Sequence, residues 1–148
     1  MATIHNEITV SVSSDKVWHL LTDLELLDKY DPTVKKSTLL STEKTGIGAK
    51  RKVLMLDGKN WFDEKVIVFK PTEALTYQLT ECSFPIKSLT HSYSFEKIGN
   101  QTKVKQVMEY TVKFGLLGKM LDAMMIRKQS DRGVKKFLVG LKAYVETH

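Results

Sequence analysis

Cysteine is almost absent from the sequence, since Cys82 is the single one among 148 residues. An internal disulfide and a metal site built from several cysteines are therefore excluded. The four histidines, His5, His19, His91 and His148, lie far apart and lack the short spacings at which histidine pairs bind metals. We accordingly expect neither a metal nor a cofactor.

Long hydrophobic runs are also missing. No apolar stretch approaches the roughly 18 residues that a membrane-spanning helix needs. Residues 1–12 alternate polar and apolar side chains and lack the apolar segment of a signal peptide. We therefore expect a cytoplasmic protein. Its length, with 42% hydrophobic and 27% charged residues, is typical of one globular domain over residues 1–148.

Charge of one sign is moderately in excess, with 23 Lys and Arg against 17 Asp and Glu and a net charge of +6. The one compact basic run, residues 50–52, lies in an expected strand, where neighbouring side chains face opposite ways. The sequence has no recognition helix, zinc finger or RNA-binding platform. We expect no nucleic-acid partner, while the charge allows transient contact with an anionic membrane surface.

The order of elements predicts an α+β fold. A strand with apolar even positions covers residues 3–12, and Ser13 or Ser14 can cap a following short helix. A second short helix, about residues 25–30, ends before Pro32, because the residue preceding proline disfavours helix. Six further strands are expected at residues 34–42, 49–56, 61–69, 75–82, 89–95 and 101–114. Strands joined by such tight turns form an antiparallel meander.

The last third of the chain predicts one long amphipathic helix over residues 115–146. Its apolar residues recur close to a period of 3.6: Leu117, Leu121, Met124, Val134, Phe137, Leu138, Leu141 and Val145. Arg127, Lys128 and Asp131 interrupt this stripe where a helix on a solid core would carry leucine or isoleucine. A helix that covers the sheet with polar groups inside its stripe indicates a cavity.

Four segments carry a resemblance to a known group of proteins. They are residues 13–18 (SSDKVW), 46–51 (GIGAKR), 64–71 (EKVIVFKP) and 115–122 (GLLGKMLD). With the element order, they make the whole chain resemble the SRPBCC superfamily, which includes START lipid-transfer domains, birch pollen allergen relatives and polyketide cyclase/dehydrase-like proteins. The resemblance implies a helix-grip fold, in which a curved antiparallel sheet of about seven strands wraps around the C-terminal helix. It implies no single activity, because members bind different ligands or catalyse unrelated reactions.

Strand alternation selects the polar groups that face the helix. Glu64 shares a face with Phe62, and His91 shares one with Leu89 and Tyr93. The candidate ligand-binding residues are Phe62, Glu64, Leu89, His91, Tyr93, Gln106, Met108 and Tyr110 on strands, and Met120, Met124, Arg127, Lys128 and Asp131 on the helix. Met120, Met124 and Met125 either line the pocket mouth or pack the helix on the sheet.

Glu64 and His91 have three interpretations. They anchor a ligand, they are the general acid and base of a cyclase or dehydratase, or they are structural, with Glu64 paired to Arg127 or Lys128. A buried carboxylate needs a cationic or hydrogen-bonding partner, water access or a raised pKa in every case. We expect the protein to bind, and as one form of this to transport, a small hydrophobic or amphipathic molecule. The alternative is an enzyme of the aromatase/cyclase or dehydratase type.

Overall fold

A computed structural model describes residues 1–148, the side chain of Met124 excepted. The elements are β1 (Ala2–Val10), α1 (Ser14–Thr22), α2 (Leu27–Tyr30), β2 (Val34–Leu39), β3 (Lys50–Met55), β4 (Trp61–Lys70), β5 (Ala74–Cys82), β6 (Ile86–Ile98), β7 (Gln101–Val112), α3 (Gly115–Leu121), the π-helical turn η1 (Asp122–Ile126) and α4 (Arg127–Thr147). In the part of the chain described, no helix is both long and apolar enough to cross a membrane.

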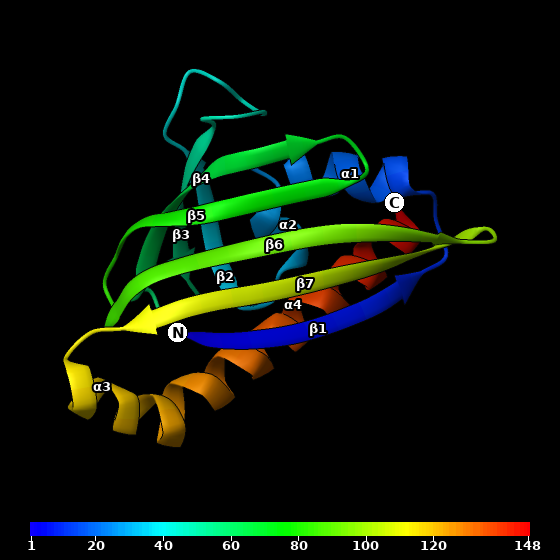
Figure 1. Ribbon diagram of the computed structural model, residues 1–148. Helices are drawn as coiled ribbons and strands as arrows, with labels where there is room; N and C mark the ends of the chain where they lie inside the picture. Colours follow the sequence, from blue (N-terminus) through cyan, green and yellow to red (C-terminus); the bar gives the residue numbers. More distant parts are fainter.

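The strands form one antiparallel sheet with the order β1-β7-β6-β5-β4-β3-β2. From β2 to β7 each strand pairs with its neighbour in sequence, while β1 pairs with β7. The two short helices therefore carry the chain from one edge of the sheet to the other. Figure 1 shows the curved sheet with α4 running across one of its faces. The predicted α+β helix-grip fold is confirmed.

Short-range signals explain how the chain leaves β1. Ser13 caps α1, since its side-chain oxygen accepts a hydrogen bond from the Lys16 backbone N–H at 3.3 Å. Asp15 follows in the first turn, where a negative charge suits the helix dipole. Val17 and Leu21 face the core and are buried. The cap and the apolar face together fix where α1 begins and which side it packs.

The second half of the long helix packs as its periodicity predicts. Its buried residues are Val134, Phe137, Leu138, Leu141 and Val145. Gly140 lets α4 approach α2 closely, because a Cβ at this position would lie 2.0 Å from the carbonyl oxygen of Tyr30. The backbone of α4 therefore lies directly against the end of α2 at this position.

The first half of the long helix differs from the prediction of one regular helix over residues 115–146. The π-helical turn η1 interrupts it between α3 and α4. A π turn inserts an extra residue and so rotates the residues before it relative to those after it. Leu117 and Leu121, predicted in the buried stripe, are exposed.

Candidate functional site

A cavity of about 340 Å³ lies between the sheet and the first turns of α4. Its apolar lining comprises Leu27, Val34, Met55, Phe62, Leu79, Phe84, Pro85, Ile86, Leu89, Tyr93, Met108, Ile126, Val134 and Phe137. Its polar lining includes Asp31, Thr33, Arg51, Asp57, Asn60, Glu64, His91, Gln106, Gln129 and Ser130. Asp57, Asn60 and Gln129 are exposed, whereas Arg51, Glu64 and Gln106 are buried. The cavity therefore opens near the β3–β4 turn and the start of α4 and ends at a buried polar group.

The inner end of the cavity contains a buried ion pair. Arg51 on β3 and Glu64 on β4 are direct cross-strand partners. Nε and Nη2 of Arg51 both lie 2.8 Å from Oε2 of Glu64. The guanidinium also stacks over the Tyr77 ring, 4.4 Å from its centroid, and donates to the Leu24 carbonyl oxygen at 3.4 Å. Arg51 is thus held by groups on three sides and fixes one Glu64 oxygen.

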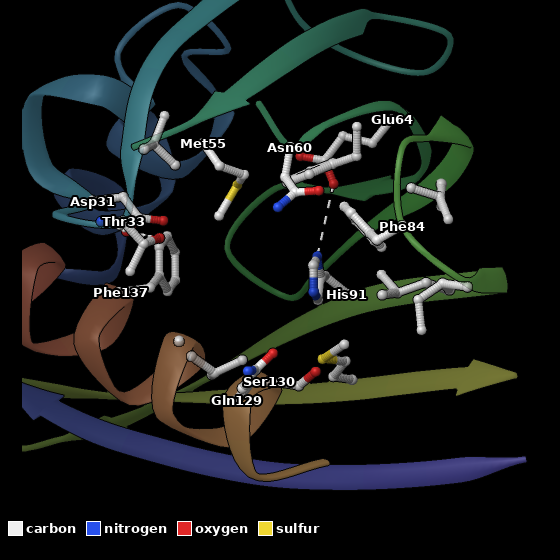
Figure 2. Close-up of a pocket in the computed structure, with 18 of the residues that line it drawn as sticks. Asp31, Thr33, Met55, Asn60, Glu64, Phe84, His91, Gln129, Ser130 and Phe137 are labelled. Carbon is white, nitrogen blue, oxygen red and sulfur yellow. Dashed lines mark hydrogen bonds and ion pairs between the residues drawn. The ribbon is translucent and has the colours of Figure 1, made fainter. Parts of the chain in front are cut away.

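The second oxygen of Glu64 faces His91 on β6. His91 Nδ1 lies 3.7 Å from Oε1, as the dashed line in Figure 2 shows. Burial raises the pKa of Glu64, but the charge of Arg51 and the interactions with His91 outweigh it and hold the pKa below its usual value. Glu64 is therefore ionised at neutral pH, and only Oε1 is left for an interaction inside the cavity.

A β-bulge in β5 lies opposite Asp63 and Glu64 of β4. The pairing of β4 with β5 shifts register between Asp63 and Glu64, which marks a β-bulge. Both residues are buried, although alternation would place one of them outside. Asp63 lies 3.8 Å from Lys52 Nζ on the neighbouring strand. Asp63 is thus a second buried carboxylate of β4, on the opposite side of the strand from Glu64.

Two neutral polar side chains complete the inner wall. Tyr93 on β6 and Gln106 on β7 are cross-strand partners, and both are buried. Burial raises the pKa of Tyr93 well above its usual value, so its hydroxyl keeps the proton and can donate. Gln106 Oε1 is fully buried and has no hydrogen-bond partner among the described residues. The wall therefore offers a donor and an unpaired acceptor.

Asp31 lines the cavity where α2 ends. Its Oδ1 accepts hydrogen bonds from the Thr33 backbone N–H at 2.9 Å and from the Thr33 hydroxyl at 2.7 Å. Burial raises the pKa of Asp31 despite these bonds. Asp31 and Glu64 are thus two cavity carboxyls whose pKa values move in opposite directions.

Seven of the predicted site residues surround the same cavity. They are Phe62, Glu64, Leu89, His91, Tyr93, Gln106 and Met108. Tyr110 lies on the same strand as Met108 and is buried, but it does not line the cavity, and its hydroxyl donates to Asp122. The strand alternation therefore located one wall, which ends before Tyr110.

Four of the predicted helix residues, Met120, Arg127, Lys128 and Asp131, do not line this cavity. Met120 is exposed, as are Arg127, whose Nη2 donates to the Thr3 carbonyl oxygen, and Lys128. Asp131 faces β1, where it accepts from Asn6 at 2.9 Å, and Lys135, at 2.6 Å. Met124 lies outside the described side chains.

These residues lie outside the cavity because a different face of α4 covers it. Ile126, Gln129, Ser130 and Gly133 face the cavity, so the charged residues between them point outward or toward β1. Met120 and Met125, both exposed, neither line the pocket mouth nor pack the helix on the sheet. Glu64 pairs with Arg51 and not with Arg127 or Lys128.

Among the lining residues absent from the prediction, Arg51 and Asp31 are the buried polar ones. Arg51 alternates with Ala49 and Val53, both fully buried, so the alternation contained a signal for it. Asp31 lies in a connection without periodicity, and no such signal exists there. Across the described residues, no group of three or more His, Cys, Asp or Glu side chains is arranged to hold a metal ion.

Solved structures with the same fold include three informative cases. The protein TTHA0849 from Thermus thermophilus is 19% identical, with a TM-score of 0.82 and 97% of each chain covered. The Zhui aromatase/cyclase from a Streptomyces species is 12% identical, with a TM-score of 0.80, 98% of this chain and 93% of that chain covered. A START superfamily protein from Mycobacterium smegmatis is 17% identical, with a TM-score of 0.77, 98% of this chain and 97% of that chain covered. At these identities the likeness shows the fold alone.

Sequence comparison gives the family. No curated protein is similar enough in sequence to count as a match. The model of the family described as "Polyketide cyclase / dehydrase and lipid transport" matches residues 1–146, which is nearly the whole chain. Together with the fold, this match confirms the resemblance to the SRPBCC superfamily, and the chain belongs to the polyketide cyclase/dehydrase and lipid transport family.

Proposed function

We propose that the protein binds one small amphipathic molecule in the cavity between the sheet and α4. The observation that carries this proposal is a cavity whose wall is mostly apolar and whose inner end holds the Arg51–Glu64 pair beside His91. Its volume of about 340 Å³ falls within the range of small-molecule sites, roughly 300–1,000 Å³. Apolar burial supplies affinity, and the inner polar groups orient the ligand.

The polar end defines which ligand groups fit. Arg51 compensates the charge of Glu64, so the inner end does not attract a strongly charged group. Oε1 of Glu64 and Oε1 of Gln106 accept hydrogen bonds, and the Tyr93 hydroxyl donates one. We therefore expect a ligand whose apolar body ends in a neutral hydroxyl or carbonyl group.

The test compares two buried tyrosines. The probes are 6-propionyl-2-(dimethylamino)naphthalene, a neutral fluorophore that carries a carbonyl group, and any ligand that co-purifies and is seen by native mass spectrometry. Tyr93→Phe removes one cavity hydroxyl and should weaken binding of a carbonyl ligand by about 2- to 10-fold, the loss of one hydrogen bond. Tyr110→Phe is the matched control, because its hydroxyl is buried outside the cavity lining, and should leave binding unchanged. Absence of any bound probe or co-purifying ligand would contradict the proposal.

A second candidate is an enzyme of the aromatase/cyclase or dehydratase type, and the Glu64–His91 contact favours it. Because Arg51 keeps Glu64 ionised, Glu64 is a weak base and acts best by orienting His91 and balancing its charge. His91 then exchanges the proton with substrate. His91→Gln should lower turnover on the order of 100-fold or more. Product analysis with polyketide-like carbonyl substrates tests it, and a broad panel without product would count against the enzyme.

A further inference from the structure

The helix α3 has an apolar surface that the fold does not cover. Leu116 is 81% exposed, Leu117 64% and Met120 61%. Phe114 before the helix and Met125 after it are also exposed. The only buried residue of α3 is a glycine, Gly118. A core helix would bury such side chains, so this segment needs a different explanation.

The packing of Gly118 explains why these side chains point outward. A Cβ at Gly118 would lie 1.7 Å from the carbonyl oxygen of Lys113, at the end of β7. The backbone of α3 therefore rests directly on the preceding chain, and no side chain fits between them. Figure 1 shows α3 at one end of the molecule, beyond the end of β7. The leucines and methionines consequently face away from the body of the protein.

Basic residues outnumber acidic ones around this surface. From residue 113 to residue 128 the basic residues are Lys113, Lys119, Arg127 and Lys128, all of them exposed. The one acid in this stretch, Asp122, accepts the hydrogen bond of the Tyr110 hydroxyl. The surface is thus apolar at its centre and basic around it.

We propose that this tip surface, formed by Phe114, Leu116, Leu117, Met120 and Met125 with Lys113, Lys119 and Lys128, docks on an anionic lipid membrane. Apolar side chains enter the boundary between headgroups and acyl chains, and basic side chains contact the anionic headgroups. A second copy of the chain fits less well, because it would bring a like-charged tip against this one. The charge complementarity therefore favours lipid.

The tip surface lies beside the cavity. Ile126, the last residue of η1, lines the cavity, and Pro85, another lining residue, accepts a hydrogen bond from the Lys113 backbone N–H at 3.0 Å. Docking of the tip therefore brings this wall of the cavity close to the membrane. The docking itself does not require that the cavity bind anything.

Vesicle co-sedimentation tests the proposal. The vesicles contain phosphatidylcholine alone or phosphatidylcholine mixed with phosphatidylserine. Wild-type protein should bind the mixed vesicles more tightly and should lose binding as salt rises. Leu116→Ser with Leu117→Ser should weaken binding on the order of 10-fold or more. Lys119→Glu should weaken binding to the mixed vesicles at least about 5-fold.

Two matched controls lie in the connection between β2 and β3, which is far from α3 in Figure 1. Ile47→Ser changes an equally exposed apolar residue, and Lys44→Glu reverses an exposed lysine. Both should bind vesicles like wild type. Melting temperatures show that each variant is folded, and Met120→Gln replaces the double serine variant if that one unfolds.

Three results would overturn the proposal. The wild-type protein does not bind the mixed vesicles, the control substitutions weaken binding as much as the tip substitutions do, or the tip variants bind as tightly as wild type. If the tip variants instead abolish a dimer seen by analytical ultracentrifugation and no vesicle binding occurs, the surface joins two copies, and the membrane proposal is wrong.

Discussion

At the scale of single residues, Glu64 has two oxygens in different environments. Oε2 takes both close contacts from Arg51, and Oε1 faces His91. A buried ion pair adds little stability over an apolar pair of the same size, because both charges lose their water. The pair is therefore better explained by what it does to the cavity, where it holds an ionised carboxylate beside His91.

The first prediction concerns that pair. Glu64→Leu leaves the Arg51 cation buried without a carboxylate and should cost about 3–5 kcal/mol in the free energy of unfolding. Adding Arg51→Met removes the unpaired charge and should recover most of the loss. Urea denaturation measures both variants. If Glu64→Leu alone has wild-type stability, water hydrates the Arg51 cation in the variant, which would contradict the burial of this side chain.

The second prediction concerns the opposite pKa shifts of the two cavity carboxyls. The pKa of Asp31 is raised in the folded state above its ordinary 3.8, so its contribution to stability is fully present below that value and is lost as pH rises through the folded pKa. The pKa of Glu64 is lowered below 4.5, so its contribution is present above that value and is lost as pH falls through the folded pKa.

Asp31→Asn should therefore raise the melting temperature at pH 7, because Asn keeps an acceptor for both Thr33 donors and carries no buried charge. The gain should vanish below about pH 4, where Asp31 is protonated in both states. Asp57→Asn is the control and should lower the melting temperature at pH 7. Backbone hydrogen bonds from Asn60 and Lys59 lower the pKa of Asp57, so its charged form is favoured in the folded state. Equal effects of both substitutions at pH 7 would refute the assignment.

At the scale of elements, periodicity predicted most of the fold and one wall of the site. Alternation on β4, β6 and β7 placed Glu64, His91 and Gln106 inside, as the structure confirms. Alternation on β3 likewise places Arg51 on the inner face. However, a basic run in a strand is also typical of a solvated surface, and the pattern alone does not distinguish a buried arginine from an exposed one. The π turn η1 has no equivalent signal, because such single turns are rare and the apolar period of 3.6 residues predicts an uninterrupted α-helix. It changes the helical register between Met120 and α4, whereas the charged residues of α4 lie outside the cavity because Gln129, Ser130 and Gly133 face it.

The third prediction compares two glycines of α4. Gly133 lines the cavity, and an added Cβ would meet nothing within 4 Å, so Gly133→Ala should stabilise the protein by up to about 1 kcal/mol through helix propensity. Gly140→Ala should destabilise it instead, because its Cβ would lie 2.0 Å from the Tyr30 oxygen and force α4 away from α2. Urea denaturation measures the change in the free energy of unfolding for each variant. A change in the same direction for both would contradict the packing described.

At the scale of the whole molecule, sheet curvature and helix approach leave the cavity open at one end. The far half of α4 packs on a filled core through Leu138 and Leu141, and Gly140 fixes its distance from α2. The near half rests over the cavity with small or polar residues, among them Ser130 and Gly133. The C-terminal half of α4 thus packs on the core, and its N-terminal half covers the cavity.

The fourth prediction tests that division by filling each half. Met108→Trp adds volume at the cavity wall and should change the free energy of unfolding by less than about 1 kcal/mol, since the ring enters empty space. Leu141→Trp is the matched change in the filled core, where Leu141 is fully buried, and should cost about 1–3 kcal/mol or more.

Ligand response separates the same two variants. A ligand specific to the folded state adds about 2.7 kcal/mol at 100 times its dissociation constant, so a bound hydrophobic probe should raise the wild-type melting temperature. Met108→Trp should abolish this rise because its ring occupies the space of the probe, while Leu141→Trp should keep the rise from a lower starting temperature. If Met108→Trp is as costly as Leu141→Trp and no probe shifts the wild-type curve, α4 covers a filled core along its whole length and ligand binding must be sought elsewhere.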